Sequence, residues 1–169
     1  MESNTKIGDY RNQPYQIKDH KQRGQWVELL FMARAAQYGL GIAKPLGDWE
    51  YYDAAVHHQG RFRSVQVKST TYCRHHSYCC NVLKGRKHTR YPRSQVNFFA
   101  FYLIPIDLWY IMPSSVVGPT RQSINFSPDL EGHRYEGYKE AWHLLFRAAS
   151  SRSRQILTPG RRWLSVGPV

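Results

Sequence analysis

Residues 61–69 alternate between apolar and polar side chains, and this pattern constrains the fold more than any other feature of the chain. Val65 and Val67 fall on one side, because side chains of an extended strand point alternately to its two faces. The residues on the opposite side are Phe62, Ser64, Gln66 and Lys68. Residues 50–56 predict a neighbouring strand, and the polar, glycine-containing segment 57–60 predicts the turn between the two. The pattern therefore predicts an antiparallel hairpin.

The register of this hairpin decides which polar side chains meet. A four-residue turn at 58–61 would set Asp53 opposite Gln66, whereas a shorter turn would make them diagonal neighbours. A glutamine between two valines of a central strand normally needs a hydrogen-bonding partner. Lys68 shares the face of Gln66. The structural alternative is that Asp53 only flanks a turn and that Lys68 is a solvated strand end.

A helix is predicted at residues 21–37, where apolar side chains recur among helix-favouring residues. Glu28 is the only acid between positions 26 and 36. A carboxylate among side chains that favour burial is costly unless it meets a cation or a hydrogen-bond donor. Packing of this helix on the sheet would bring Glu28 beside Asp53. A structural ion pair of Glu28 with Arg34 or another base is the alternative.

Two carboxylates, an amide oxygen and an ammonium together suit a site for a hard divalent cation, Mg²⁺ or Mn²⁺. The predicted metal ligands are Glu28, Asp53, Gln66 and the backbone carbonyl of Val67. In phosphodiester hydrolysis such a cation polarises the phosphate and lowers the pKa of a bound water. Lys68 would orient or deprotonate that water and balance the charge on the phosphate. The predicted catalytic residues are Glu28, Asp53, Gln66 and Lys68.

These residues resemble the PD-(D/E)xK nuclease superfamily in their order and context. The resemblance rests on Glu28 in the first helix, Tyr52-Asp53, and Val65-Gln66-Val67-Lys68. With a glutamine in place of the second acid, the pattern resembles a branch of the superfamily that includes some small homing endonucleases and resolvase-like proteins of prokaryotes. Residues 96–102 and 109–113 resemble the closing strands of that branch, so the resemblance covers residues 21–115. It implies an α/β, restriction-endonuclease-like core, with a central mixed sheet of roughly four to five strands flanked by helices.

The glutamine leaves two functions open. Tyr52 stands where the proline of the family name would be, and Gln66 stands where an acid is usual. The predicted metal site therefore carries one negative charge fewer. The first function is a metal-dependent DNA endonuclease of homing or resolvase type. The alternative is a DNA-binding protein with a catalytically inactive nuclease fold. A basic RNA-binding or zinc-stabilised module is a third, weaker reading.

The charge balance favours a polyanionic partner. The chain has 24 Lys and Arg against 12 Asp and Glu, a formal net charge of +12. Such a surface favours DNA because phosphate binding releases condensed counterions, although the same composition also favours solubility. Residues 70–94 are basic and aromatic, and the predicted DNA-binding residues are Arg74, Lys84, Arg86, Lys87, Arg90 and Arg93. Because duplex cleavage needs two active centres, a homo-oligomer is expected, either a dimer or a tetramer.

The expected organisation is a flexible arm at 1–20, a nuclease core at 21–115 and a C-terminal extension at 116–169. The extension should contain a second long helix at 138–149, followed by a basic tail. Within the core, residues 96–104 and 108–112 predict a second, more buried hairpin.

Cys73, Cys79 and Cys80 are an odd number of cysteines close together, which suits reduced thiols better than a disulfide scaffold. With His75 and His76 they include zinc-ligand types, but the spacing favours ordinary loop residues. Apolar runs fall far short of the ~20 residues that span a bilayer, and residues 1–20 lack an apolar signal core. A cytoplasmic protein is therefore expected.

Overall fold

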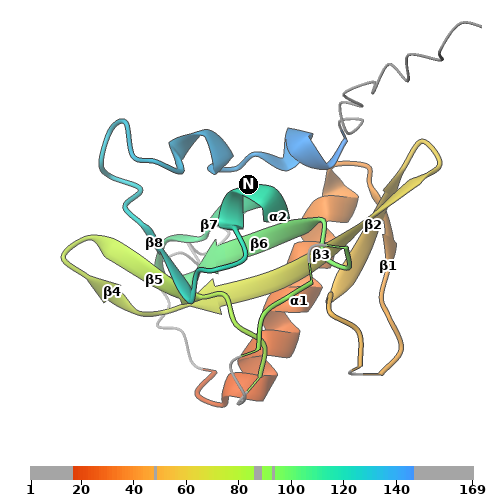
Figure 1. The fold of residues 1–169 in the computed structure, drawn as a ribbon, viewed down its shortest axis with the longest axis horizontal. Coiled ribbons are helices and arrows are strands. Elements are labelled where there is room, and N and C mark those ends of the chain that lie inside the picture. The colour runs from red at the N-terminus through yellow and green to blue at the C-terminus, as the bar shows by residue number, and fades with distance from the viewer. Residues whose placement is uncertain (1–16, 48, 86–88, 93, 147–169) are drawn as a thin grey trace, which may run out of the picture.

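The computed structural model describes residues 17–47, 49–85, 89–92 and 94–146. Within them, a long helix crosses one face of a five-stranded mixed sheet (Figure 1). These elements are α1 (His20–Gln37), β1 (Gly41–Ala43), β2 (Ala54–His58), β3 (Arg61–Thr70), β6 (Phe98–Leu103) and β7 (Leu108–Pro113). The strand order is β1-β2-β3-β6-β7, with β3 and β6 parallel and the other neighbours antiparallel. The expected α/β fold class is confirmed.

Helix α1 forms where the periodicity predicts it. It begins after Asp19, whose carboxylate accepts a hydrogen bond from the backbone N–H of Gln22 at 2.8 Å and so caps the first turn. Val27, Phe31 and Ala35 are buried and lie four residues apart, on one face of the helix. The Phe31 ring contacts Trp109 and Trp142 at centroid distances of 5.8 and 5.7 Å. This face fixes α1 on the sheet.

The β2–β3 hairpin has the register that a four-residue turn predicts. Pairing runs from His58↔Arg61 to Ala54↔Val65. Gln59 and Gly60 both have positive φ, as a two-residue type I′ connection requires. The first strand begins at Ala54, four residues later than expected, and extends to His58. Just before it, the Asp53 N–H donates to the Val65 carbonyl at 3.0 Å, so Asp53 ends the ladder beside Gln66.

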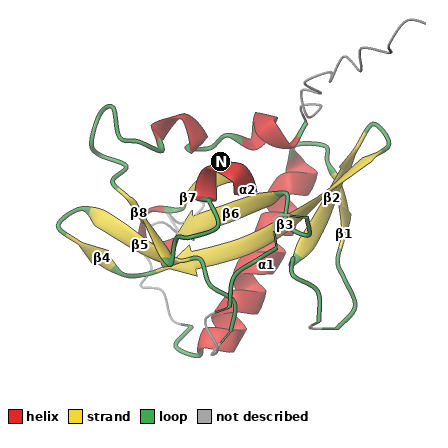
Figure 2. Cartoon of the chain, in the orientation of Figure 1, coloured by secondary structure: helices red, strands yellow, loops and turns green. Residues whose placement is uncertain are grey.

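The two faces of the five-stranded sheet are both covered. Val65 and Val67 of β3 belong to the core cluster that packs under α1. The alternate residues of β6, Phe99 and Phe101, belong to a second cluster on the opposite face. That face is covered by a three-stranded sheet, in the order β4-β5-β8, and by a short helix (Figure 2). These elements are β4 (Cys73–Arg74), β5 (Ser77–Asn81), β8 (Ser123–Phe126) and α2 (Ser114–Val117).

These strands test two predictions, one for the hairpin at 96–112 and one for the three cysteines. The buried hairpin predicted at 96–104 and 108–112 is confirmed as β6 and β7, joined by a 3₁₀ turn at Ile104–Ile106. The expectation of ordinary loop residues for Cys73, Cys79 and Cys80 is wrong, because they lie in β4 and β5. Cys80 is buried, and it packs in the second core cluster with Phe99 and Phe101.

The long helix predicted at 138–149 is wrong within the described residues. The chain instead forms two 3₁₀ turns, Glu136–Tyr138 and Trp142–Leu145. Glu140 between them has a φ of +47°, and its carboxylate accepts from the Trp109 N–H and from the indole N–H of Trp142, each at 2.7 Å. These tertiary bonds and the burial of Trp142 and Leu145 override the local helical pattern. Residues 147–149, the basic tail and most of the N-terminal arm lie outside the described residues.

No helix in the described parts of the chain is long and apolar enough to cross a membrane.

Candidate active site

A cavity of about 250 Å³ brings together three of the four predicted catalytic residues. Glu28 reaches it from α1, Asp53 from the segment that leads into β2, and Gln66 from the middle of β3. The wall also includes Lys44, Lys84 and Tyr91. The fourth predicted residue, Lys68, lies next to this wall, since its ammonium bonds to the Tyr91 hydroxyl. The helix and the two strands thus converge on one cavity.

Gln66 and Asp53 form the floor of this cavity. The Gln66 side chain is only 6% exposed. Its amide Nε2 donates to Asp53 Oδ2 at 2.5 Å and to the backbone carbonyl of Val67 at 3.2 Å. Asp53 Oδ2 also accepts from the Val67 N–H at 2.8 Å. A carboxylate oxygen and a carbonyl oxygen therefore converge on one point, which the amide nitrogen of Gln66 occupies.

Burial makes the Asp53 carboxylate unusually basic. Desolvation is the largest cause and, with the nearby negative charge of Glu28, it outweighs the Val67 hydrogen bond and the positive charges of Lys68 and Lys44. Together these effects raise the pKa of Asp53 to about 6. A further positive charge in this cavity would favour the ionised carboxylate of Asp53. This is the electrostatic character of a cation site.

Glu28 faces the cavity as half of an ion pair. Its carboxylate lies 3.2 Å from Lys44 Nζ, and the side chain of Glu28 is about a quarter exposed. Lys44 follows β1, so the pair ties the helix to the loop that borders the cavity. An ion pair of Glu28 with Arg34 or another base was the structural alternative, and the pair is present with Lys44. Arg34 instead bonds to Asp107 at 3.2 Å. Glu28 is accordingly held at the cavity mouth.

Lys68 is oriented by two acceptors. Its ammonium donates to the Leu83 carbonyl at 3.0 Å and to the Tyr91 hydroxyl at 2.8 Å. Desolvation lowers the pKa of Lys68, and the Asp53 carboxylate partly offsets this effect. The Tyr91 ring is itself fixed by edge contacts with Tyr51 and Phe99 at 6.4 and 5.5 Å. The position of the amine therefore depends on a tyrosine 23 residues further along the chain.

Sequence reasoning missed Tyr91 and Lys44 as members of this site. Tyr91 is one of three tyrosines in the 70–94 segment, where no periodicity indicated which of them would contact Lys68. No local pattern marked Lys44 as a partner of Glu28. Their roles follow from tertiary contacts alone.

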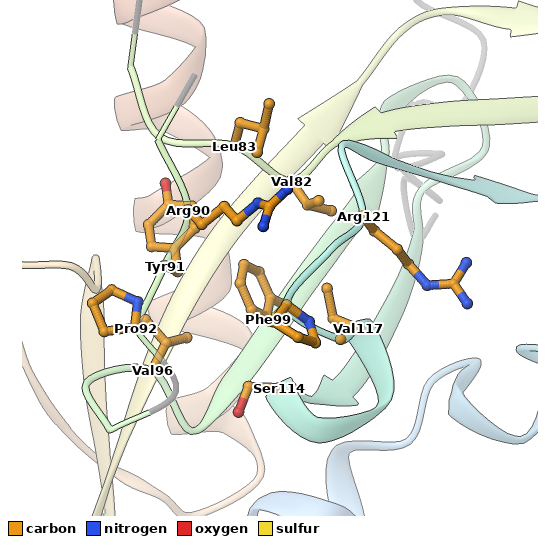
Figure 3. A pocket seen from close by; sticks show the side chains of 12 residues that line it. Val82, Leu83, Arg90, Tyr91, Pro92, Val96, Phe99, Ser114, Val117 and Arg121 are labelled. Atoms are coloured by element: carbon orange, nitrogen blue, oxygen red, sulfur yellow. The ribbon is translucent and has the colours of Figure 1, made fainter. Parts of the chain in front are cut away.

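The residues predicted to bind DNA are spread over separate places. Lys84 lines the cavity, donates to the Glu50 carbonyl at 3.0 Å and lies 4.0 Å from the centre of the Tyr51 ring. Arg74 is exposed in β4. Arg90 borders a second, smaller hollow on the other side of Tyr91, where Figure 3 shows its side chain extending toward Val82. The remaining members, Arg86, Lys87 and Arg93, lie outside the described residues.

The donor set fits a hard cation rather than zinc. Across the described ranges, no group of three or more His, Cys, Asp or Glu residues is placed to hold a metal ion. The cavity instead offers the carboxylates of Asp53 and Glu28, with the neutral oxygens of Gln66 and Val67 near them. Oxygen donors of this kind suit Mg²⁺ or Mn²⁺.

A family model described as PD-(D/E)XK endonuclease matches residues 18–145. The chain belongs to this family. The match runs from just before α1 through the last 3₁₀ turn, and so includes β8, which lies beyond residue 115. The predicted resemblance, built on Glu28, Asp53 and the Gln66–Lys68 strand, is confirmed.

Two solved structures are similar to this PD-(D/E)XK protein. One is the bacterial homing endonuclease I-Ssp6803I, with 27% identity, a TM-score of 0.66, and coverage of 75% of this chain and 93% of that chain. The other is the Holliday junction resolvase Hjc of Archaeoglobus fulgidus, with 12% identity, a TM-score of 0.43, and coverage of 63% and 85%. No curated protein matches the sequence.

Proposed function

We propose that the protein is a Mg²⁺- or Mn²⁺-dependent endodeoxyribonuclease. The observation that carries the proposal is the cavity in which Glu28, Asp53 and Gln66 meet, with the Lys68 ammonium fixed beside it, in a member of the PD-(D/E)XK endonuclease family. Glu28, Asp53, Gln66 and Lys68 are the proposed catalytic residues.

The proposed metal ligands are Glu28, Asp53, Gln66 and the Val67 carbonyl. Asp53 Oδ2 and the Val67 carbonyl already share the Gln66 amide as a common partner. A half-turn of that amide would present its oxygen where its nitrogen now lies, which completes an oxygen-lined position. When bound there, the cation polarises the phosphate and lowers the pKa of a water molecule. The raised pKa of Asp53 indicates that its carboxylate gains stabilisation from a positive charge.

Lys68 acts on the attacking water or the phosphate. Two of the three N–H groups of the Lys68 ammonium donate to the Leu83 carbonyl and the Tyr91 hydroxyl. The third can then be directed toward the cavity. A donor held in this way stabilises the charge that develops on the phosphate, and Tyr91 serves as its positioning residue.

DNA is the proposed substrate. The net charge of +12 favours a polyanion, and the solved structure with 27% identity is a homing endonuclease. Lys84, Arg74 and Arg90, together with Arg86, Lys87 and Arg93 outside the described residues, would neutralise phosphates. Cleavage of both strands needs two active centres, so we propose a homodimer or a tetramer, acting in the cytoplasm.

The alternative is a DNA-binding protein whose nuclease site is inactive. It is favoured by the glutamine at position 66, since its amide donates to both oxygens that a cation would use. Titration with Mn²⁺, followed by electron paramagnetic resonance, separates the two functions. Binding that Asp53→Ala abolishes supports the endonuclease, and absence of such binding supports the inactive protein.

Plasmid nicking tests the endonuclease directly. The full chain is incubated with supercoiled plasmid in Mg²⁺, in Mn²⁺ and in EDTA, alongside Asp53→Asn. The control variant is Asp129→Asn, because Asp129 is an exposed acid that faces His76 and not the cavity. Nicking that needs the metal and Asp53, but not Asp129, is the expected result. Nicking of equal rate by Asp53→Asn would remove Asp53 from the mechanism.

A further inference from the structure

Trp49 is an exposed aromatic side chain in the loop that borders the cavity. It is 74% exposed, whereas Trp109 and Trp142 are each 2% exposed. Tryptophan has a large apolar surface that is usually covered in part, so an exposed ring beside a cavity is a candidate contact for a ligand. Gly47 and Glu50, on either side of Trp49 in the chain, both line the cavity that holds Glu28, Asp53 and Gln66.

The ring of Trp49 lies directly on Gly47. A Cβ atom added to Gly47 would come within 2.2 Å of the six-membered ring of Trp49, and Gly47 has a φ of +79°. Only glycine therefore permits both this backbone conformation and this approach. The contact holds the ring in one position while most of its surface remains in solvent. If the ring served only to anchor the loop, it would be buried rather than 74% exposed.

A lysine ammonium is fixed against the two residues that follow Trp49 in the chain. Lys84 Nζ bonds to the carbonyl of Glu50, the residue after Trp49, at 3.0 Å. The same ammonium lies over the Tyr51 ring at 4.0 Å. An ammonium that binds phosphate and an aromatic face that accepts a base are the two features by which proteins hold unpaired nucleotides.

We propose that Trp49, supported by Gly47, stacks on the base of an unstacked nucleotide adjacent to the phosphate that is cut. The inference rests on the proposed function and names the form of DNA that the site takes: duplex with a locally opened or kinked step. Leu46, which is 86% exposed in the same loop, would contact the neighbouring base or sugar, as apolar side chains do at kinked steps. A second copy of this chain is a weaker fit, because two side chains cover far less area than a stable interface needs.

The proposal is tested with DNA that carries 2-aminopurine, whose fluorescence changes when its stacking changes. The label is moved through the positions around the cut site, with Ca²⁺ in place of Mg²⁺ so that the DNA stays intact. Wild-type protein should change the fluorescence strongly at one or two positions. Trp49→Ala should abolish this change and weaken binding roughly 5- to 100-fold, and Trp49→Tyr should restore most of it.

Gly47→Ala moves the ring without removing it, so it should reproduce the loss that Trp49→Ala causes. Gly60→Ala is its matched control, because Gly60 also has a positive φ, +75°, and nothing lies within 4 Å of its added Cβ. Leu130→Ala controls for the loss of an exposed apolar side chain, as Leu130 is 63% exposed. A normal fluorescence change with Trp49→Ala overturns the proposal. The proposal is also overturned if wild-type protein sediments as an oligomer and Trp49→Ala as a monomer, while the 2-aminopurine fluorescence change is the same for both.

Asp53→Asn separates this proposal from the proposed function. It should stop cleavage and leave the 2-aminopurine signal in place. If wild-type protein shows the Trp49-dependent signal but cuts no DNA, the endonuclease fails and the stacking site stands. If it cuts DNA without the signal, the stacking site fails and the endonuclease stands.

Discussion

The two faces of β3 have the same backbone and different roles. Val65 and Val67 are buried in the core cluster beneath α1. Gln66 and Lys68 point to the other face, where their polar atoms are fixed by hydrogen bonds. On the first face the favourable free energy comes from apolar burial. On the second face, burial of polar groups costs free energy that the hydrogen bonds only offset.

This difference means that stability and activity should separate along a single strand. Substitutions of the valines should lower the free energy of unfolding and leave the cavity chemistry intact. Substitutions of the polar residues should remove cleavage and leave the fold intact. If both sets of variants lost stability and activity together, the contrast between the two faces would be broken.

Lys68→Met should give the largest effect. Loss of the ammonium should slow single-turnover DNA cleavage by about 10²- to 10⁴-fold, the range for a positioned proton-transfer or charge-stabilising group. Thermal unfolding should be unchanged or slightly improved, because burial lowers the pKa of Lys68 and thus disfavours its charged form. Lys139→Met is the control, since Lys139 is exposed and bonds to the Pro128 carbonyl. Unaltered cleavage by Lys68→Met would contradict the mechanism.

Val65→Ala should have the opposite profile. Val65 is fully buried between α1 and the sheet, so the loss of two methyl groups should lower the free energy of unfolding by about 2 kcal/mol. Urea denaturation measures this change. Cleavage well below the unfolding transition should stay within about threefold of wild type, because Val65 does not line the cavity. A loss of cleavage as large as that of Lys68→Met would show that the two faces are coupled.

The pH dependence of the metal-free protein should report on Asp53. Its pKa is about 6 in the folded protein against 3.8 in the unfolded chain. Between these values the folded state holds a proton that the unfolded state has released, so the free energy of unfolding should fall as the pH rises from about 4 to 6. The expected decrease is on the order of 2 kcal/mol.

Urea denaturation in EDTA across this pH range measures the decrease. Asp53→Asn should flatten the profile, because an asparagine cannot titrate. Asp129→Asn should leave it unchanged. Stability that rises through this range in wild type and not in Asp53→Asn would reverse the sign of the Asp53 contribution.

Tyr91→Phe should give the smallest change. It keeps the ring contacts with Tyr51 and Phe99 and removes the hydroxyl that accepts from Lys68. The single-turnover rate should fall about tenfold, the equivalent of one hydrogen bond to a charged group. The dissociation constant for DNA in Ca²⁺ should not change. Weaker DNA binding with an unchanged rate would assign Tyr91 to substrate contact instead of to the position of Lys68.

Local pattern was sufficient for α1, which buries one face at a regular spacing, and for the β2–β3 hairpin, which has alternating side chains and a glycine turn. It was also sufficient for β6–β7, which is dense in apolar and aromatic residues and is buried almost throughout. It failed at 138–149, where Glu140 bonds across to Trp109 and Trp142 and breaks the expected helix. It also predicted no secondary structure for 70–94, because β4 pairs with β5 and β5 pairs with β8, more than forty residues away in the sequence.

Of the two hairpin registers that the sequence left open, the structure has the one that sets Asp53 beside Gln66. The sequence by itself determined that Gln66 and Lys68 share a face of β3, because side chains alternate along a strand. This is a short-range consequence of strand geometry. Only the tertiary structure decided that Glu28 reaches the same cavity, that Tyr91 holds Lys68, and that Trp49 rests on Gly47. Such contacts depend on how whole elements pack, and no local spacing encodes that packing.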